Sequence, residues 1–227
     1  MTLRILTTAT ALLLVAGCAL TYPFEGGVAV AVMPHGAAET HGSTEMAGDE
    51  QGRRVAHAAR QFVGRTNMRV GDKRFNYDCS GTILAIYYAA GIDLLPEFAA
   101  QGGNGVRRLY GIARDHRLLY APKLPRPGDI IFWDNTYDRN GDGRWNDELT
   151  HAGIVTSVTE NGQLEYVHHN YRRGIVVERM NLYEPDVHTG TDGLVNSPMR
   201  MRSHRYIKPS EWLASHLYRE AGRLHQL

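Results

Sequence analysis

Apolar residues recur at helical spacing in three stretches of the N-terminal half of the chain. The stretches cover residues 53–63, 79–90 and 106–120, and each places its apolar side chains on one face of a helix. In the first stretch these residues are Val55, Ala58, Ala59, Phe62 and Val63. Gly64 and Gly91 follow the first two stretches at positions where glycine ends a helix. The pattern therefore predicts three helices before residue 121.

Four short apolar segments in the C-terminal half predict strands. They are residues 130–133, 151–159, 164–168 and 174–179. Turn residues between them, such as Asn161 and Gly162, predict hairpins and an antiparallel sheet. Residues 209–224 return to helical spacing, which predicts a C-terminal amphipathic helix. The order of these elements indicates an α+β fold, with N-terminal helices packed on a central antiparallel β-sheet.

The first residues have the pattern of an export signal. The apolar run at residues 5–16 follows Arg4 and is too short to span a bilayer. Small residues precede Cys18 as in the lipobox of bacterial lipoproteins, which predicts cleavage before Cys18 and lipidation of its sulfur. An ordinary signal peptide with an incidental cysteine is the alternative. The predicted organisation is a lipoprotein signal peptide at 1–17, a flexible tether at 18–52 and one domain at 53–227.

Composition narrows the class of protein. The 227 residues are 43% hydrophobic, enough for one buried core. There are 25 basic and 24 acidic residues, a net charge of +1, and no long basic block supports nucleic-acid binding. If Cys18 is lipidated, Cys79 is the only free thiol of the mature chain in an export compartment.

Cys79 stands at the predicted start of the second helix, between Asp78 and Ser80. Unpaired amide donors and the positive end of the helix dipole favour a thiolate there, which predicts a thiol pKa below the ordinary value. A cysteine that only fills the core is the competing interpretation.

Histidines stand on the predicted strands. His151 opens the second strand and is the candidate general base; a histidine that merely caps a hairpin is the alternative. His168 and His169 end the third strand and point to opposite faces, so only one of them can join the site.

Four motifs around these residues carry a family resemblance. They are Asp-Cys-Ser-Gly at 78–81, Arg-Pro-Gly-Asp-Ile-Ile-Phe from 126, Thr-His-Ala-Gly-Ile-Val from 150, and Tyr-Val-His at 166–168 followed by Gly-Ile-Val-Val. In this order the chain resembles the NlpC family of papain-like bacterial cell-wall peptidases, over residues 53–179. The loop at 65–76 departs from the family, which usually carries a tyrosine and paired glycines there.

The resemblance implies a papain-like fold and a cysteine peptidase mechanism. Cys79 would be the nucleophile, His151 the base and His168 the orienting residue, with His169 as the alternate. Asp78 and Ser80 would lie close enough to hold a substrate amine. Family members commonly cleave the bond between D-glutamate and a diamino acid in peptidoglycan stem peptides.

The segment between the first two predicted strands resembles the opening of a calcium loop. Asp138, Asn140 and Asp142 alternate and are followed by Gly143, and Ca²⁺ prefers such oxygen ligands. The further candidate ligands are Asn146 and Asp147. The position of the closing glutamate is Leu149, and a solvated polar hairpin is the alternative. No cofactor is expected for catalysis itself.

These observations predict a lipid-anchored peptidoglycan hydrolase that acts on stem peptides. It would be bound to the cell envelope through its lipid, in the outer membrane facing the periplasm, since Ala19 stands where an aspartate often signals inner-membrane retention. Two alternatives stay open: a papain-like amidase or acyl transferase, and a catalytically inactive lipoprotein that binds the wall.

Overall fold

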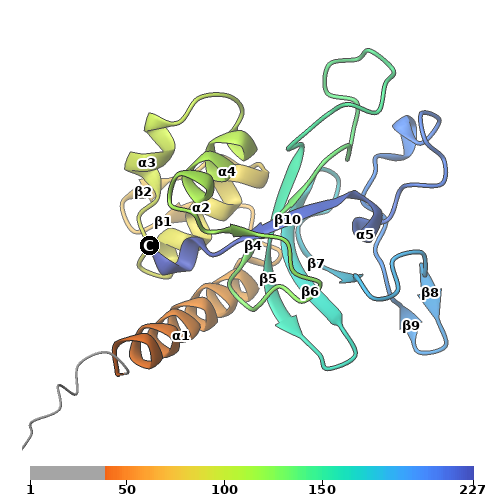
Figure 1. Cartoon of the computed structure of the whole chain (residues 1–227). Coiled ribbons are helices and arrows are strands. Elements are labelled where there is room, and N and C mark those ends of the chain that lie inside the picture. Colours follow the sequence, from red (N-terminus) through yellow and green to blue (C-terminus); the bar gives the residue numbers. More distant parts are fainter. Residues whose placement is uncertain (1–38) are drawn as a thin grey trace, which may run out of the picture. The chain divides into compact units, whose positions relative to one another are not determined.

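The computed structural model describes the backbone of residues 39–227 and the side chains of residues 49–227. This part of the chain has an α+β fold around a six-stranded antiparallel sheet (Figure 1). The strands, in their order across the sheet, are β3 (Leu119–Tyr120), β10 (Tyr218–Gly222), β4 (Ile130–Trp133), β5 (His151–Val158), β6 (Gln163–Asn170) and β7 (Gly174–Asn181).

Four helices gather on one side of this sheet (Figure 1). They are α1 (Glu39–Phe62), α2 (Cys79–Ala89), α3 (Leu95–Ala100) and α4 (Gly105–Asp115). Helices α1 and α2 pack against each other and against β5. The start of α2 therefore lies beside the strands that carry the candidate histidines.

The remaining elements are short. The loop before α2 contains the hairpin of β1 (Arg69–Val70) and β2 (Lys73–Arg74), and a second hairpin pairs β8 (Thr189–Gly190) with β9 (Gly193–Leu194). Helix α5 (Ala214–Leu217) and two 3₁₀ turns, η1 (Arg202–His204) and η2 (Leu224–Gln226), complete the fold. Helix α5 and the β8–β9 hairpin lie across the sheet from α2 to α4 (Figure 1).

Both faces of the sheet are covered. Successive side chains of a strand point to opposite faces, so Ile130 and Phe132 of β4 pack with the helices, while Ile131 and Trp133 pack with α5. All four are buried. Burial of apolar surface, which contributes about 25 cal/mol per Å², is the main stabilising contribution to such a core.

Helix α1 contacts the residues just before β4 through a pair of glycines, Gly52 and Gly128. A Cβ on Gly128 would lie 2.3 Å from the carbonyl oxygen of Gly52, and Gly128 also has a φ of +93°. Only glycine fits this backbone contact. The next residue, Asp129, is fully buried and accepts hydrogen bonds from the Tyr120 hydroxyl and from the Arg126 amide at 2.6 Å. Part of the Arg-Pro-Gly-Asp motif therefore serves packing.

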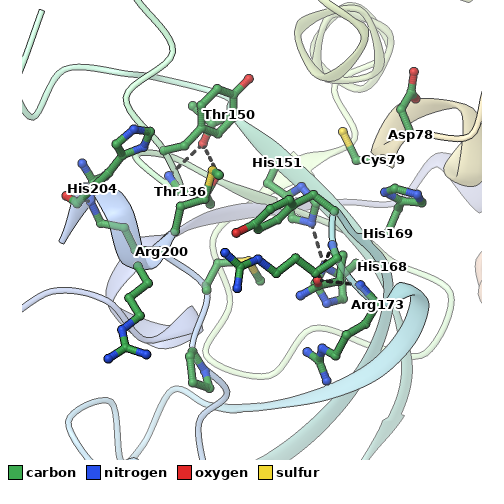
Figure 2. Close-up of a pocket in the computed structure, with 18 of the residues that line it drawn as sticks. Asp78, Cys79, Thr136, Thr150, His151, His168, His169, Arg173, Arg200 and His204 are labelled. Carbon is green, nitrogen blue, oxygen red and sulfur yellow. Dashed lines mark hydrogen bonds between the residues drawn. The ribbon is translucent and has the colours of Figure 1, made fainter. Parts of the chain in front are cut away.

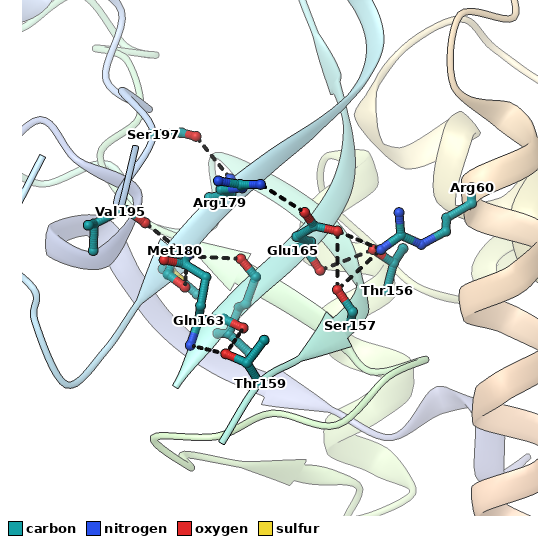
Figure 3. Close-up of polar contacts among 11 residues, drawn as sticks. Arg60, Thr156, Ser157, Thr159, Gln163, Glu165, Arg179, Met180, Val195 and Ser197 are labelled. Atoms are coloured by element: carbon teal, nitrogen blue, oxygen red, sulfur yellow. Dashed lines mark hydrogen bonds and ion pairs between the residues drawn. The ribbon is translucent and has the colours of Figure 1, made fainter. Parts of the chain in front are cut away.

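Polar contacts fix the far end of the β5–β6 hairpin (Figure 3). The Arg60 guanidinium of α1 pairs with Glu165 of β6 at 2.6 Å and reaches Ser157 of β5 at 3.1 Å. The Gln163 amide donates to the carbonyl oxygens of Met180 and Val195 at 3.2 and 3.0 Å. These contacts tie α1, the sheet and the segment after β9 together.

The four predicted strands are confirmed as β4, β5, β6 and β7, with ends that differ by one or two residues. The helix predicted at 79–90 is α2. The helix predicted at 106–120 ends at Asp115, and residues 119–120 form β3 instead. Helix α3 and the two short hairpins were not predicted.

The predicted C-terminal helix at 209–224 is wrong. Only residues 214–217 are α-helical, and residues 218–222 form β10 between β3 and β4. Apolar side chains at Leu217, Tyr218 and Ala221 satisfy either period over so short a segment. The open edges of β3 and β4 decide the outcome, because a central strand satisfies hydrogen bonds on both sides.

The predicted tether is wrong for residues 39–52, which are helical in α1. The face of α1 from Gly52 to Phe62 is buried, which stabilises the helix, and extending an existing helix costs little. The predicted signal peptide, Cys18 and residues 18–38 of the tether lie outside the described residues. None of the described helices combines the length and apolarity needed to cross a membrane.

Candidate active site

One cavity of about 680 Å³ brings the three predicted catalytic residues to the same wall. Cys79 comes from the start of α2, His151 from the start of β5 and His168 from β6. Figure 2 shows Cys79 and Asp78 on one side of His151, with Arg200 and His204 on the other side. The cavity thus has one wall that carries the thiol and the imidazoles. The facing wall is formed by residues that follow β9 in the sequence.

The position of Cys79 follows from the capping of α2. Asp78 is the N-cap, and its carboxylate accepts from the Gly81 amide at 2.7 Å. A Cβ on Gly81 would lie 2.2 Å from the Asn76 carbonyl oxygen, so the approach loop passes directly against the helix start. This leaves Cys79 in the first turn, where the amides have no partner within the helix.

The surroundings of Cys79 raise the pKa of its thiol to about 11. Burial is the largest cause, and the neighbouring Asp78 carboxylate adds to it. The amides of Ser80 and Cys79 favour the thiolate and lower the pKa, as expected at a helix start, but burial outweighs them. The sequence-based expectation of a lowered thiol pKa is therefore wrong for the free protein, and Cys79 rests as a neutral thiol.

His151 and His168 are hydrogen-bonded to each other. The Nε2 atom of His151 lies 2.7 Å from Nδ1 of His168, because β5 and β6 pair with Gly153 opposite His168. Burial, and then the charges of His168 and His169, hold the pKa of His151 well below its usual value. Burial and the Arg173 charge lower the pKa of His168 to about 3. Both rings are neutral at pH 7.

A buried carboxylate lies behind His168. Oε2 of Glu178, on β7, lies 3.1 Å from His168 Nε2, which is ion-pair distance although the atoms are not aligned for a hydrogen bond. The Tyr166 hydroxyl donates to the same oxygen at 3.2 Å, and Arg173 pairs with the other oxygen. We call the row His151, His168 and Glu178 the relay.

His169 points elsewhere. Its ring lies edge-on to Tyr77, with centroids 4.5 Å apart, and it makes no hydrogen bond to His151. Of the two candidate histidines, His168 is therefore the one that contacts His151. Tyr77 also approaches Gly174, where a Cβ would lie 2.4 Å from the phenol oxygen.

Tyr137, which the sequence did not single out, lies near Cys79 in the same cavity. Burial raises the pKa of the Tyr137 phenol, and the negative charge of an ionised Cys79 raises it further. A neutral phenol near the sulfur is a hydrogen-bond donor for negative charge that develops there.

The two predicted substrate-binding residues have different surroundings. Asp78 lines the cavity, whereas Ser80 is not among the residues that line it. The Ser80 hydroxyl donates to Asp78 at 2.9 Å and lies against Gly105 of α4, where a Cβ would be 2.1 Å from Ser80 Oγ. The contacts of Ser80 therefore support the helix start.

The candidate calcium loop lies between β4 and β5, outside the cavity. Asp138 accepts from the amides of Gly141 and Gly143 at 2.8 and 3.0 Å. The Asp142 carboxylate accepts from the side-chain amides of Asn140 and Asn146 at 3.1 and 2.9 Å.

Asp147 differs from the other loop carboxylates. It is buried, and neither of its oxygens has a hydrogen-bond partner. Within the described residues, no three His, Cys, Asp or Glu side chains form a group that could hold a metal. Calcium binding stays a prediction, and Asp147 is the loop carboxylate whose oxygens accept no hydrogen bond.

The facing wall of the cavity was missed by the sequence analysis. It is formed by residues 198–205, which follow β9 and contain η1, and by the β6–β7 turn. This wall is rich in arginine. Glu178 was missed as well, although a glutamate directly after the apolar run Ile175 to Val177 was a signal that could have identified it.

No protein-family model matches the chain, and no curated protein matches it significantly. The family resemblance therefore stands on the quoted motifs alone.

Proposed function

We propose that this protein is a lipid-anchored peptidoglycan hydrolase, a cysteine peptidase of the NlpC type with a papain-like fold. The observation that carries the proposal is the relay: His151 and His168 line the cavity together with Cys79, and Glu178 lies behind His168. A nucleophile, a base and a group that orients the base are the three parts such chemistry needs.

The relay supplies a reason for the correct tautomer of the base. A carboxylate can only accept, so Glu178 favours the proton of His168 on Nε2. Nδ1 of His168 then accepts from Nε2–H of His151. The proton of His151 is thereby fixed on Nε2, and its Nδ1 is left as a free base. That nitrogen has no hydrogen-bond partner among the described residues, and His151 lines the cavity beside Cys79.

The reaction follows from neutral partners. His151 Nδ1 takes the thiol proton as the Cys79 sulfur attacks the amide carbonyl carbon. The oxyanion accepts from the Cys79 amide and from the Tyr137 hydroxyl. Collapse breaks the C–N bond, and the imidazolium gives its proton to the leaving amine. Water, activated by His151, then hydrolyses the thioester and restores the thiol.

The substrate assignment rests on the family resemblance. Peptidoglycan stem peptides, cut between D-glutamate and a diamino acid, are the substrates it implies. Asp78 is the acidic side chain that lines the cavity and would hold a substrate amine. Attachment through Cys18 would keep the enzyme at the membrane, in the outer membrane facing the periplasm.

The raised pKa of Cys79 favours one alternative, a lipoprotein that binds the wall without catalysis. Thiol alkylation does not separate the two readings, because a neutral resting thiol reacts slowly with iodoacetamide at pH 7 in either case. Product analysis does separate them. It also distinguishes a peptidase from an amidase or an acyl transferase.

The test is mass spectrometry of muropeptides released from purified sacculi. The wild type is expected to release fragments with new D-glutamyl ends, and Cys79→Ala to release none. The chain offers a matched pair for the base, because His168→Ala should abolish release and His169→Ala should largely retain it. Equal fragments from wild type and Cys79→Ala would overturn the proposal.

A further inference from the structure

The lining of the cavity is strongly cationic. Among the described residues that line it, Asp78 is the one acidic residue, against five arginines. The arginines are Arg172, Arg173, Arg200, Arg202 and Arg205. Such a charge imbalance around a concave site attracts anions.

Four of these arginines form no ion pair within the described residues, although the charges of Asp147 and Asp138 lie near enough to Arg200 to act on its pKa. Arg173 pairs with Glu178, but no ion pair joins Arg172, Arg200, Arg202 or Arg205 to a carboxylate of the described residues. Arg200 is the strongest case, because it is 2% exposed and its Nη2 atom is buried without a hydrogen-bond partner. A buried guanidinium with an unused donor is costly unless a ligand completes it.

The arginines repel one another in the free protein. Burial lowers the pKa of Arg205, and the nearby positive charge of Arg202 lowers it further. Like charges brought together on one wall are relieved when an anion binds between them.

Contacts with the rest of the protein hold the arginine-rich wall in a defined position. The Met201 amide donates to the Thr136 carbonyl at 2.8 Å, and the Asp138 amide donates to His204 Nδ1 at 3.1 Å. Arg205 lies over the Trp212 ring at 4.3 Å. Its side chain is therefore ordered before any ligand arrives, which reduces the entropy lost on binding.

We propose that Arg202 and Arg205, supported by Arg200, form a carboxylate-binding subsite across the cavity from Cys79. The inference rests on the proposed hydrolase function and specifies its substrate class: amides that carry a free carboxylate beside the scissile bond. A planar guanidinium binds a carboxylate through two parallel hydrogen bonds. An amidated peptide offers no negative charge to this wall, so the site discriminates against it.

Binding measured on Cys79→Ala tests the subsite without turnover. The probes are the tripeptide L-Ala-γ-D-Glu-diaminopimelate and its analogue with every carboxyl group amidated, titrated by calorimetry. The free acid is expected to bind at least about tenfold more tightly, as loss of one charge-assisted pair requires. Adding Arg202→Gln and Arg205→Gln should remove most of that difference.

Arg54→Gln is the control for loss of a positive charge outside the cavity lining, since Arg54 is exposed on α1. Arg200 is left unchanged, because its hydrogen bonds to the His204 and Asn135 carbonyl oxygens support the fold. Circular dichroism verifies that each variant is folded.

The outcomes separate the two proposals. Discrimination that depends on Arg202 and Arg205, with no sacculus cleavage by the wild type, would keep the subsite and overturn the hydrolase. Cleavage without discrimination would keep the hydrolase and overturn the subsite. Equal binding of the two peptides, no measurable binding of either, or an equal loss in Arg54→Gln would also overturn the subsite.

Discussion

The two walls of the cavity are built in different ways. The relay wall stands on β5, β6 and β7, is buried, and has a partner for each of its charges. The arginine wall stands on the segment after β9 that contains η1 and on the β6–β7 turn, and most of its arginines form no ion pair within the described residues. In the first wall the protein pairs its own charged groups, which fixes their geometry. In the second wall it leaves arginines without an ion pair, which creates a place for a ligand.

Loss of the carboxylate behind His168 should have the largest effect. Glu178→Gln keeps the shape of the side chain but removes the charge that fixes both histidine tautomers. We expect kcat to fall by about 10²- to 10³-fold, within the range of general-base catalysis, with KM little changed. Steady-state hydrolysis of a defined stem peptide measures this. Glu165→Gln is the control. Glu165 is ion-paired like Glu178, but it lies on β6 and outside the cavity lining. Equal losses in the two variants would mean that Glu178 acts only through stability.

Tyr137→Phe should have a smaller effect on the same step. Removing one oxyanion donor while keeping the ring is expected to lower kcat by about tenfold or more. Tyr171→Phe serves as the control, because Tyr171 lines the cavity and is exposed. A change in KM alone for Tyr137→Phe would move this residue from the reaction to substrate binding.

The pH dependence should distinguish the relay from an ordinary histidine. His151 must be unprotonated to accept the thiol proton, and its pKa is lowered by burial. Activity is thus retained as pH falls through 6.5 and is lost only well below it. An unperturbed imidazole would keep about a tenth of its base form at pH 5.5. We expect kcat/KM to stay above half of its neutral value there, with folding verified at each pH. An acid limb centred at 6.5 or higher would contradict the buried, neutral relay.

Calcium should have the smallest effect. If the loop at 138–147 binds Ca²⁺, a saturating concentration should raise the melting temperature by about 2–4 °C for each kcal/mol of binding, and a chelator should reverse it. Asp147→Asn should abolish the shift, whereas Asp186→Asn, an exposed acid outside the loop, should retain it. No shift at millimolar Ca²⁺ would leave the loop as a polar hairpin.

The sequence predicted the relay wall better than the arginine wall for a physical reason. Cys79, His151 and His168 stand at or near the ends of regular elements, which periodicity locates, and the family resemblance implied their roles. Glu178 needed the register of β6 and β7, which a single sequence does not contain. Residues 198–205 have no period, and their position depends on contacts such as Met201 with Thr136. The strand β10 was mistaken for a helix because its place is set by β3 and β4.

The thiol pKa illustrates the same limit. The helix start that the sequence predicted is present, and its amides do favour the thiolate. Burial and Asp78 act in the opposite direction, and burial of this kind depends on tertiary packing. The local motif therefore predicted the effect of the helix amides on the thiol pKa correctly. It predicted the direction of the overall pKa shift incorrectly.

Rapid acid quench during turnover, followed by mass spectrometry of the protein, tests the central claim most directly. Attack by the Cys79 sulfur predicts an added mass equal to the acyl portion of the substrate, located on the peptide that contains Cys79 and absent from Cys79→Ala, which should form no product. Product release by Cys79→Ala at the wild-type rate, with no acyl mass on the wild-type protein at any quench time, would contradict the account.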